Sequence, residues 1–298
     1  MRVIQLSDLH LGPRNHGATY KQEANREAWD YARAVAKQLR AIASAPPKTG
    51  NSPREPDAPR EDELVVVVTG DLTDEGHVNP AELAPAARWL GTLPGRVLCV
   101  PGNHDVGNFA TARASPTVSE RFLAQWESEI GPDRFQHAAD GHRLIGLNAM
   151  LIGSGLAAEA EQEQWLADEL HAAEAAGESV WVFQHAPLFL REPGEIREAR
   201  EHYWCPDAGP RDRMLRLLDR PAVKGLGHGH VHRRYDQWHG GRVYRACPAL
   251  SGTHTDADYF PRDAQVDRHD LACWDLTRDG AELSWLPTGL ETTTRYVG

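Results

Sequence analysis

The chain has 298 residues, 41% of them hydrophobic and 25% charged, which is long enough for one large domain with a well-buried core or for two small ones. Its formal net charge of -11 argues against a general nucleic-acid-binding protein, whose surface is normally basic. No apolar run approaches the roughly 18 residues of a membrane span, so the sequence predicts a soluble protein without a membrane partner.

The N-terminal half alternates predicted strands and helices. A strand at 2–7 precedes a helix at about 20–43, in which apolar residues recur every three to four positions. Residues 44–62 are crowded with proline and charge and predict an exposed insertion. The continuously apolar, β-branched segment 64–69 predicts a strand that is covered on both faces. The same rhythm continues with a helix at 81–90 and a strand at 96–100.

The C-terminal half continues this pattern. The predicted elements are helices at 119–130, 157–176 and 213–218, and strands at 134–136, 143–148, 179–183 and 223–227. The polar stretch 190–212 is a candidate lid over a substrate, although its Tyr203 and Trp204 could instead simply anchor a long loop onto the core. Residues 242–298 predict C-terminal antiparallel strands at 243–247, 271–276 and 281–286.

The predicted location is the cytoplasm. The first residues are typical of a strand and leave no room for the charged, apolar and cleavage regions of a secretory signal. The four cysteines are scattered without any paired spacing, which is typical of reduced thiols in an intracellular protein. The sequence does not indicate an oligomeric state.

Five short groups of polar residues follow predicted strands. They are Asp8-Leu9-His10, Gly70-Asp71, Gly102-Asn103-His104-Asp105, Gln184-His185 and Gly229-His230-Val231-His232. Each group alone is weak evidence, since short motifs of this kind are commonly turns or helix caps. In α/β sheets, however, ligands gather beyond the carboxyl ends of strands, so these groups could share one crevice within a single domain spanning 1–298. Carboxylate, carboxamide and imidazole groups that converge in this way can hold two divalent cations.

The first group carries a geometric expectation. Asp8 and His10 alternate along what the sequence predicts to be an extended segment, so both side chains should point to the same face and bind one cation together. Asp71 has two carboxylate oxygens and is the natural bridge between two cations.

The order and content of the five groups resemble the calcineurin-like metallophosphoesterase superfamily over roughly residues 1–250. The start of the chain and the Gly70–Asp74 motif look most like the bacterial cyclic-nucleotide phosphodiesterase branch. The resemblance implies a four-layer α-β-β-α sandwich with two mixed sheets. It also implies dinuclear-metal-dependent hydrolysis of a small phosphoester. We expect a phosphodiesterase, either cyclic-nucleotide-like or promiscuous, with manganese, iron or zinc as the two divalent metal ions.

The resemblance also implies residue roles. The implied metal ligands are Asp8, His10, Asp71, Asn103, His185, His230 and His232. His104 is the implied catalytic residue, which would stabilise the transition state or protonate the leaving oxygen while a metal-bridging hydroxide attacks in line. Either Asp105 or Asp74 could orient its imidazole, and the sequence does not choose between them.

Several alternatives stay open. Gly227-His228-Gly229-His230 also fits the Gly-His-x-His pattern, but we favour the later register and expect His228 to be structural or to lie behind the ligands. His16 and His254 could face the substrate or lie in exposed polar turns. A phosphomonoesterase, a nuclease of the same superfamily and a non-catalytic scaffold are the alternative functions, and the acidic chain makes the nuclease the weaker one.

Overall fold

The computed structural model describes residues 1–13, 19–44, 64–112, 116–195, 203–254, 269–277, 280–290 and 295–296. The predicted insertion at 44–62 lies outside this part of the chain except for its first residue, and so do residues 196–202 of the candidate lid. Within the described ranges, no helix combines the length and the apolar character that a bilayer-spanning segment needs.

The first sheet has five strands in the order β12-β11-β1-β2-β3. Their bounds are β1 Arg2–Leu6, β2 Leu64–Thr69, β3 Arg96–Val100, β11 Leu271–Thr277 and β12 Gly280–Leu286. β1, β2 and β3 run parallel, whereas β11 pairs antiparallel with both β1 and β12. The carboxyl ends of β1, β2 and β3 therefore meet at one edge of this sheet.

The second sheet has six strands in the order β4-β5-β6-β7-β9-β8. Their bounds are β4 Phe135–Ala139, β5 His142–Leu147, β6 Ser179–Gln184, β7 Val223–His228, β8 Tyr235–His239 and β9 Arg242–Ala246. β5, β6, β7 and β9 run parallel, and β4 and β8 pair antiparallel at the two edges. A short parallel pair, β10 Thr253–His254 and β13 Arg295–Tyr296, lies apart from both sheets.

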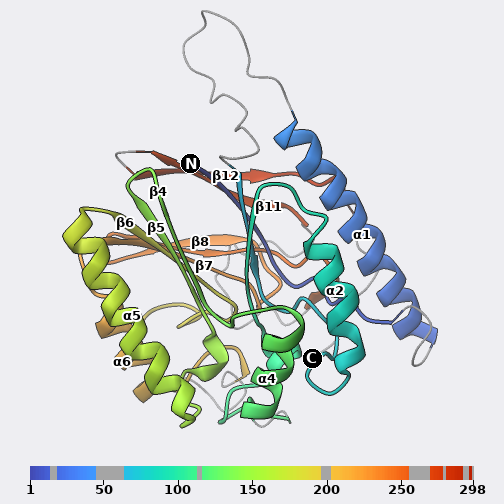
Figure 1. Cartoon of the computed structure of the whole chain (residues 1–298), viewed down its shortest axis with the longest axis horizontal. Helices are drawn as coiled ribbons and strands as arrows, with labels where there is room; N and C mark the ends of the chain where they lie inside the picture. Colours follow the sequence, from blue (N-terminus) through green and yellow to red (C-terminus); the bar gives the residue numbers. More distant parts are fainter. Residues whose placement is uncertain are drawn as a thin grey trace, which may run out of the picture.

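Helices cover the outer face of each sheet (Figure 1). The helices are α1 Thr19–Ala43, α2 Leu83–Leu90, α3 Asn103–Val106, α4 Glu120–Glu129, α5 Ala157–Ala176 and α6 Ala208–Leu218, with single 3-10 turns at Pro80–Glu82 and Ala149–Leu151. In Figure 1, α1 and α2 lie on one side of the strands and α5 and α6 on the other. The order of layers is therefore helix, sheet, sheet, helix.

Alternating side chains of the strands build three hydrophobic layers. On β2, Val66 and Val68 pack outward with α1, α2 and α4, whereas Val65 and Val67 pack inward between the sheets. The inward layer also contains Trp181 and Trp274, one from each sheet. A third cluster lies between the second sheet and helices α5 and α6. The predicted four-layer α-β-β-α sandwich with two mixed sheets is confirmed. The layers cover both faces of strands such as β2, whose residues are all buried.

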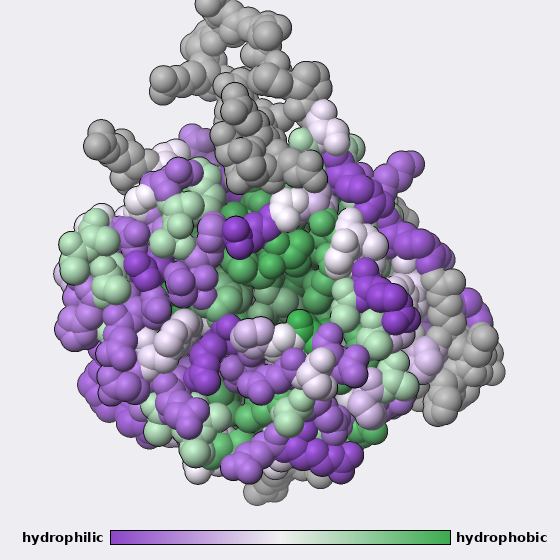
Figure 2. Space-filling view, in the orientation of Figure 1, coloured by the Kyte–Doolittle hydropathy of each residue, from purple (hydrophilic) through white to green (hydrophobic). Residues whose placement is uncertain are grey.

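The side of the sandwich between the edge strands β3 and β4 is partly open. A cavity of about 490 Å³ lies there, and its apolar lining includes Val97, Leu98, Ile130 and Phe135. Figure 2 shows a hydrophobic hollow in the middle of the same face of the molecule. Strand β3 is correspondingly the least buried parallel strand of its sheet.

The structure corrects one predicted pairing and adds strands that the sequence did not predict. The segment at 243–247 does not join β11 and β12 in one C-terminal set, because β9 lies in the second sheet, where it pairs parallel with β7 and antiparallel with β8. The pair β10 and β13 is also parallel. Among the described residues of 242–298, β11 and β12 pair with each other in antiparallel fashion as expected. Strand β8 was missed because its alternating polar side chains lie on a sheet edge and give only a weak apolar signal.

Gln5 connects the two sheets beneath the strand ends. Its buried Nε2 donates to Thr69 Oγ1 at 3.1 Å within the first sheet and to the carbonyl of His228 at 3.1 Å in the second. Its Oε1 accepts from Trp274 Nε1 at 3.2 Å. Because a buried amide is costly when unpaired, this fully satisfied side chain fixes how the two sheets meet next to the loops that follow β2 and β7.

Candidate dinuclear metal site

The five polar groups of the sequence meet where the two sheets adjoin. Backbone hydrogen bonds tie their loops together: the amide of Asp8 donates to Gly70 O at 3.1 Å, that of His10 to Asp71 O at 3.0 Å, and that of Gly229 to His185 O at 2.8 Å. Loops that are far apart in the sequence thus lie side by side at the carboxyl ends of β1, β2, β6 and β7.

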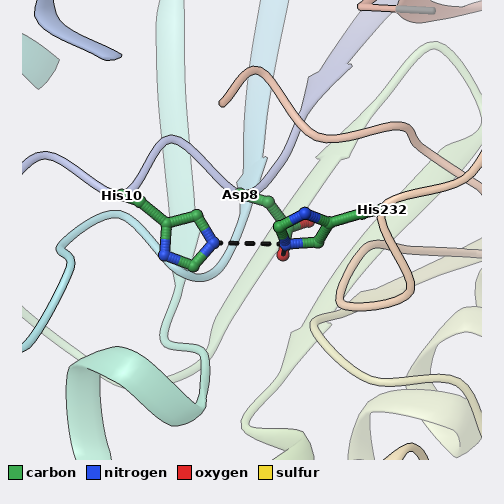
Figure 3. Close-up of side chains that lie close together, drawn as sticks. All are labelled: Asp8, His10 and His232. Carbon is green, nitrogen blue, oxygen red and sulfur yellow. Dashed lines mark hydrogen bonds and ion pairs between the residues drawn. The ribbon is translucent and has the colours of Figure 1, made fainter. Parts of the chain in front are cut away.

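The first group of candidate metal ligands is Asp8, His10 and His232 (Figure 3). The Nε2 atoms of His10 and His232 lie 3.2 Å apart, and His232 Nε2 lies 3.2 Å from Asp8 Oδ1. Figure 3 shows one ring nitrogen of His10 and one of His232 directed toward each other, with the carboxylate of Asp8 beside His232. All three side chains are buried.

The second group is Asp71, His185 and His230, joined by the amide of Asn103. His185 Nε2 lies 3.2 Å from Asp71 Oδ2 and 3.1 Å from Asn103 Oδ1. Asp71 Oδ2 also lies 3.8 Å from His10 Nε2, so this carboxylate stands between the two groups. That is the place of a bridging ligand.

These spacings fit two coordination shells. Neighbouring ligands of one tetrahedral or octahedral ion, with bonds of about 2.1 Å, lie about 3.0–3.4 Å apart. Four donor pairs across the two groups are separated by 3.1–3.2 Å. The donors are imidazole nitrogen, carboxylate oxygen and amide oxygen, without thiolate, a set that suits manganese, iron or zinc. The residues therefore fit a pair of divalent cations.

The backbone adopts an unusual conformation at the candidate ligands. Asp8, His10, Asp71, His230 and His232 have φ values of 55°, 49°, 48°, 67° and 50°. Our expectation that Asp8 and His10 alternate along an extended segment was therefore wrong. Left-handed residues turn these side chains inward, and such conformations cluster at functional sites because surrounding contacts must enforce them.

Two glycines allow the loops to approach each other. A Cβ atom at Gly102 would lie 2.2 Å from Asp71 Oδ1, and one at Gly229 would lie 1.7 Å from Ser7 Oγ. Neither contact is sterically possible, so no other residue fits at these positions without moving the loops. The glycines of the Gly-Asn-His-Asp and Gly-His-Val-His motifs thus act through close packing.

Burial and mutual charge set the protonation of the group. Burial lowers the pKa of His10 to about 3 and that of His230 to about 3, so both rings are neutral, the form that binds a metal. Burial opposes ionisation of Asp71, but the neighbouring His185 and His104 hold its pKa well below the usual range. For His185, burial is outweighed by Asp71, which raises the pKa to about 9.

His104 lies next to both groups. Its backbone amide donates to Asp71 Oδ1 at 2.9 Å, and its ring lies 4.7 Å from that of His10, edge to face. Its Nδ1 donates to the backbone carbonyl of Asp74, which leaves Nε2 directed away from that loop. Burial lowers the pKa of His104, but the carboxylate of Asp71 outweighs burial and the net pKa is raised.

Asp74 and Asp105 both lie close to His104, and the two play different parts. Asp74 orients the ring with its backbone carbonyl. Asp105 is fully buried and accepts from the amides of Leu72, Thr73 and Gly102 and from the Thr73 hydroxyl. It therefore ties the loop after β2 to the loop after β3.

The remaining predicted residues lie in different environments. His228 ends β7, and its Nδ1 lies 3.1 Å from Gly229 O; among the described residues it belongs to neither candidate group, in line with the later Gly-His-x-His register. Burial lowers its pKa to about 4. His16 lies outside the described residues, and His254 lies in β10, where the side chain is likewise outside them.

The sequence did not reveal the groups that orient the candidate ligands. His185 Nδ1 donates to the carbonyl of Thr69 at 2.8 Å, and His77 Nδ1 bonds the carbonyl of His104 at 2.8 Å. Tyr203, considered only as a lid or an anchor, contacts both Asn103 and His230. Backbone carbonyls carry no sequence signal, whereas the side chains of His77 and Tyr203 could have been considered by inspecting the sequence.

A family model described as calcineurin-like phosphoesterase matches residues 1–234. The chain belongs to the calcineurin-like phosphoesterase family. Its members are dinuclear-metal-dependent, and the chain is accordingly a metal-dependent phosphoester hydrolase. The resemblance inferred from the five sequence groups is thereby confirmed.

Curated relatives of this calcineurin-like chain carry one name. The chain is 31% identical over 250 residues to the serine/threonine-protein phosphatase CPPED1 of Danio rerio, and the match covers 80% of the chain and 72% of that protein. It is 31% identical over 141 residues to the protein of the same name from Homo sapiens, covering 46% of the chain and 41% of that protein.

Solved structures share the calcineurin-like fold. A dimetal phosphatase from Danio rerio matches with a TM-score of 0.58 and 16% identity, covering 97% of the chain and 96% of that structure. The purple acid phosphatase PPD1 from Lupinus luteus matches with a TM-score of 0.61 and 11% identity, covering 99% of the chain and 53% of that structure. At these identities the likeness supports the fold alone.

Proposed function

We propose that the protein hydrolyses phosphomonoesters with two divalent cations. The first would be held by Asp8, His10 and His232, the second by Asn103, His185 and His230, with Asp71 between them. The observation that carries this proposal is the 3.1–3.2 Å spacing of four donor pairs, which matches neighbouring ligands of a common ion. When bound, two such cations supply charge neutralisation at the phosphoryl oxygens and a nucleophile that is active near neutral pH.

His104 would act on the substrate as proton donor. Because its Nδ1 donates to the Asp74 carbonyl, Nε2 is the nitrogen that remains to reach a leaving-group oxygen. The raised pKa of His104, which Asp71 causes against the effect of burial, favours the protonated ring that this role needs. The role of Asp105 would be indirect: it fixes the loops that carry Asp71 and His104.

The monoester preference rests on the relatives. The Danio rerio protein that is 31% identical over 80% of the chain is named a serine/threonine-protein phosphatase, and the removal of phosphate from serine or threonine is hydrolysis of a monoester. A diester preference, with a cyclic nucleotide as the typical substrate, is the second candidate. The Gly70–Asp74 motif, with its likeness to the bacterial cyclic-nucleotide branch, favours it.

Steady-state kinetics of the metal-reconstituted protein test the proposal. We expect kcat/KM for p-nitrophenyl phosphate and for a phosphothreonine peptide to exceed that for bis(p-nitrophenyl) phosphate and for cyclic AMP by at least tenfold. A reversed ratio would establish the diesterase. Absence of turnover on all four compounds, together with absence of bound metal, would instead support a non-catalytic scaffold and end the proposal.

A further inference from the structure

Tyr203 lies within the candidate lid segment 190–212, ahead of α6, and contacts two candidate ligands of the second cation. Its backbone carbonyl accepts from His230 Nε2 at 3.0 Å, and its hydroxyl accepts from Asn103 Nδ2 at 3.3 Å. A single residue from a separate part of the chain therefore meets the loop after β3 and the loop after β7.

The carbonyl contact decides which nitrogen of His230 is available. A neutral imidazole has one N–H and one lone pair. Because Nε2 donates to Tyr203 O, the proton resides on Nε2 and Nδ1 keeps its lone pair. In metal sites, such a partner behind the ring fixes the tautomer and the orientation of the ligand.

The hydroxyl contact decides which end of the Asn103 amide faces the site. With Nδ2 directed to Tyr203, Oδ1 lies on the opposite side, 3.1 Å from His185 Nε2. Only the oxygen of a carboxamide can bind a cation, because the nitrogen is a donor. The tyrosine hydroxyl thus selects the productive rotation of this side chain.

Aromatic packing holds Tyr203 against His230. The ring centroids of Tyr203 and His230 lie 5.0 Å apart, and the Trp204 ring, which is buried, lies 5.3 Å from His230. The Tyr203 and Trp204 rings contact each other edge to face at 5.0 Å. Two consecutive aromatic residues therefore flank one imidazole, which limits its freedom to rotate.

We propose that Tyr203 is a positioning residue of the second cation site: it presents Asn103 Oδ1 and His230 Nδ1 to the metal and does not itself touch the reacting atoms. The inference rests on the proposed two-cation function. It gives residues 203–204 a role that differs from both a lid over the substrate and a mere anchor on the core.

Tyr203→Phe is the direct test, because it removes the hydroxyl but keeps the ring and the backbone carbonyl. Calorimetric titration of metal-stripped protein with Mn²⁺ should give two binding steps for the wild type. In Tyr203→Phe we expect the binding step of the second cation site to weaken by about tenfold, and that of the first cation site to stay unchanged. This is the usual effect of losing a partner behind a metal ligand. Tyr203→Ala, which also removes the flanking ring, should weaken it further, by up to about 100-fold.

Tyr244→Phe is the matched control. Tyr244 is a buried tyrosine of β9 that packs against Phe189 and His239 on the far side of the second sheet. Its Mn²⁺ titration should equal that of the wild type. Two steps of unchanged affinity in Tyr203→Phe, or an equal weakening of both steps, would overturn the inference. A wild type that binds no Mn²⁺ would overturn the proposed function instead, so the two failures are distinguishable.

A spectroscopic readout makes the test independent of folding in the variants. In ¹⁵N-labelled wild-type protein, the His230 ring should show a protonated Nε2 in the metal-free state, and titration with diamagnetic Zn²⁺ should shift the Nδ1 resonance. A ring protonated on Nδ1, or a shift of Nε2 in place of Nδ1, would contradict the assigned role of the Tyr203 carbonyl.

Discussion

The Nε2 atoms of His10 and His232 lie 3.2 Å apart although 222 positions separate the two residues in the chain. One ring belongs to the loop after β1 in the first sheet and the other to the loop after β7 in the second. The first candidate cation site therefore exists only when both sheets are packed together.

Asp71→Asn should weaken both cation sites, because Asp71 lies between the two groups. Titration with Mn²⁺ should show a loss of affinity in both steps, and kcat/KM should fall by more than the ~10–100-fold typical of residues behind a ligand. His232→Asn should weaken only the binding step of the first cation site. Asp168→Asn, an exposed aspartate on α5, serves as control. Selective loss of one step in Asp71→Asn would contradict a bridging position.

His104→Ala should abolish most of the turnover while metal binding remains. We expect kcat to fall by about 10²–10⁴-fold, the usual contribution of a positioned proton donor. Elemental analysis after reconstitution should still find two cations per chain. The exposed His171→Ala on α5 is the matched control. If His104→Ala loses metal and turnover in parallel, His104 would have to be a ligand, a role that its contact with His10 and Asp71 also permits.

Gln5→Leu should destabilise the protein through its core. The substitution leaves the Trp274 indole N–H and the His228 carbonyl without the partner that Gln5 provides. We expect the free energy of unfolding to fall by about 1–3 kcal/mol, measured by urea denaturation. Gln38→Leu, whose amide donates to Pro287 O in an exposed bond, should change it by less than about 0.5 kcal/mol. Equal effects would show that the contact between the sheets does not depend on Gln5.

Glu82 should make stability fall as the pH rises from about 4.5 to 7. Burial raises the pKa of this carboxyl to about 7 in the folded chain, from an ordinary value of 4.5. Between these values the folded state holds more protons than the unfolded state, so the free energy of unfolding decreases with pH, by up to about 3 kcal/mol in total. Urea denaturation of metal-free protein at pH 4.5 and 7.5 measures the slope. Glu82→Gln should remove this part of it, and identical slopes in the two proteins would refute the assignment.

Local signals in the sequence predicted most of the helices and strands and the candidate groups, whereas the four-layer sandwich was implied by the family resemblance. The apolar, β-branched β2 is covered on both faces as expected, and α5 begins and ends where its apolar periodicity predicted. The polar groups follow the strands that were expected to carry them. Strand β8 could not be predicted, since it pairs at a sheet edge with β9 and its mostly polar sequence gives only a weak strand signal.

The contacts that orient the site could not be predicted for a physical reason. The groups that fix His185 and His104 are the carbonyls of Thr69 and Asp74, and every residue has a carbonyl. Likewise, the left-handed backbone of Asp8 and His10 is enforced by neighbouring loops, whereas side-chain alternation alone suggested an extended segment. Such features depend on tertiary packing between distant segments.

The backbone has positive φ angles at five candidate metal ligands, Asp8, His10, Asp71, His230 and His232, and this conformation lowers the stability of the fold. Each non-glycine residue in this region costs on the order of 1 kcal/mol, which a glycine would relieve. Selection for thermal stability alone, in evolution or in the laboratory, would accordingly favour glycine at these positions and remove the activity. The candidate metal ligands at these positions therefore lower the free energy of unfolding relative to glycine.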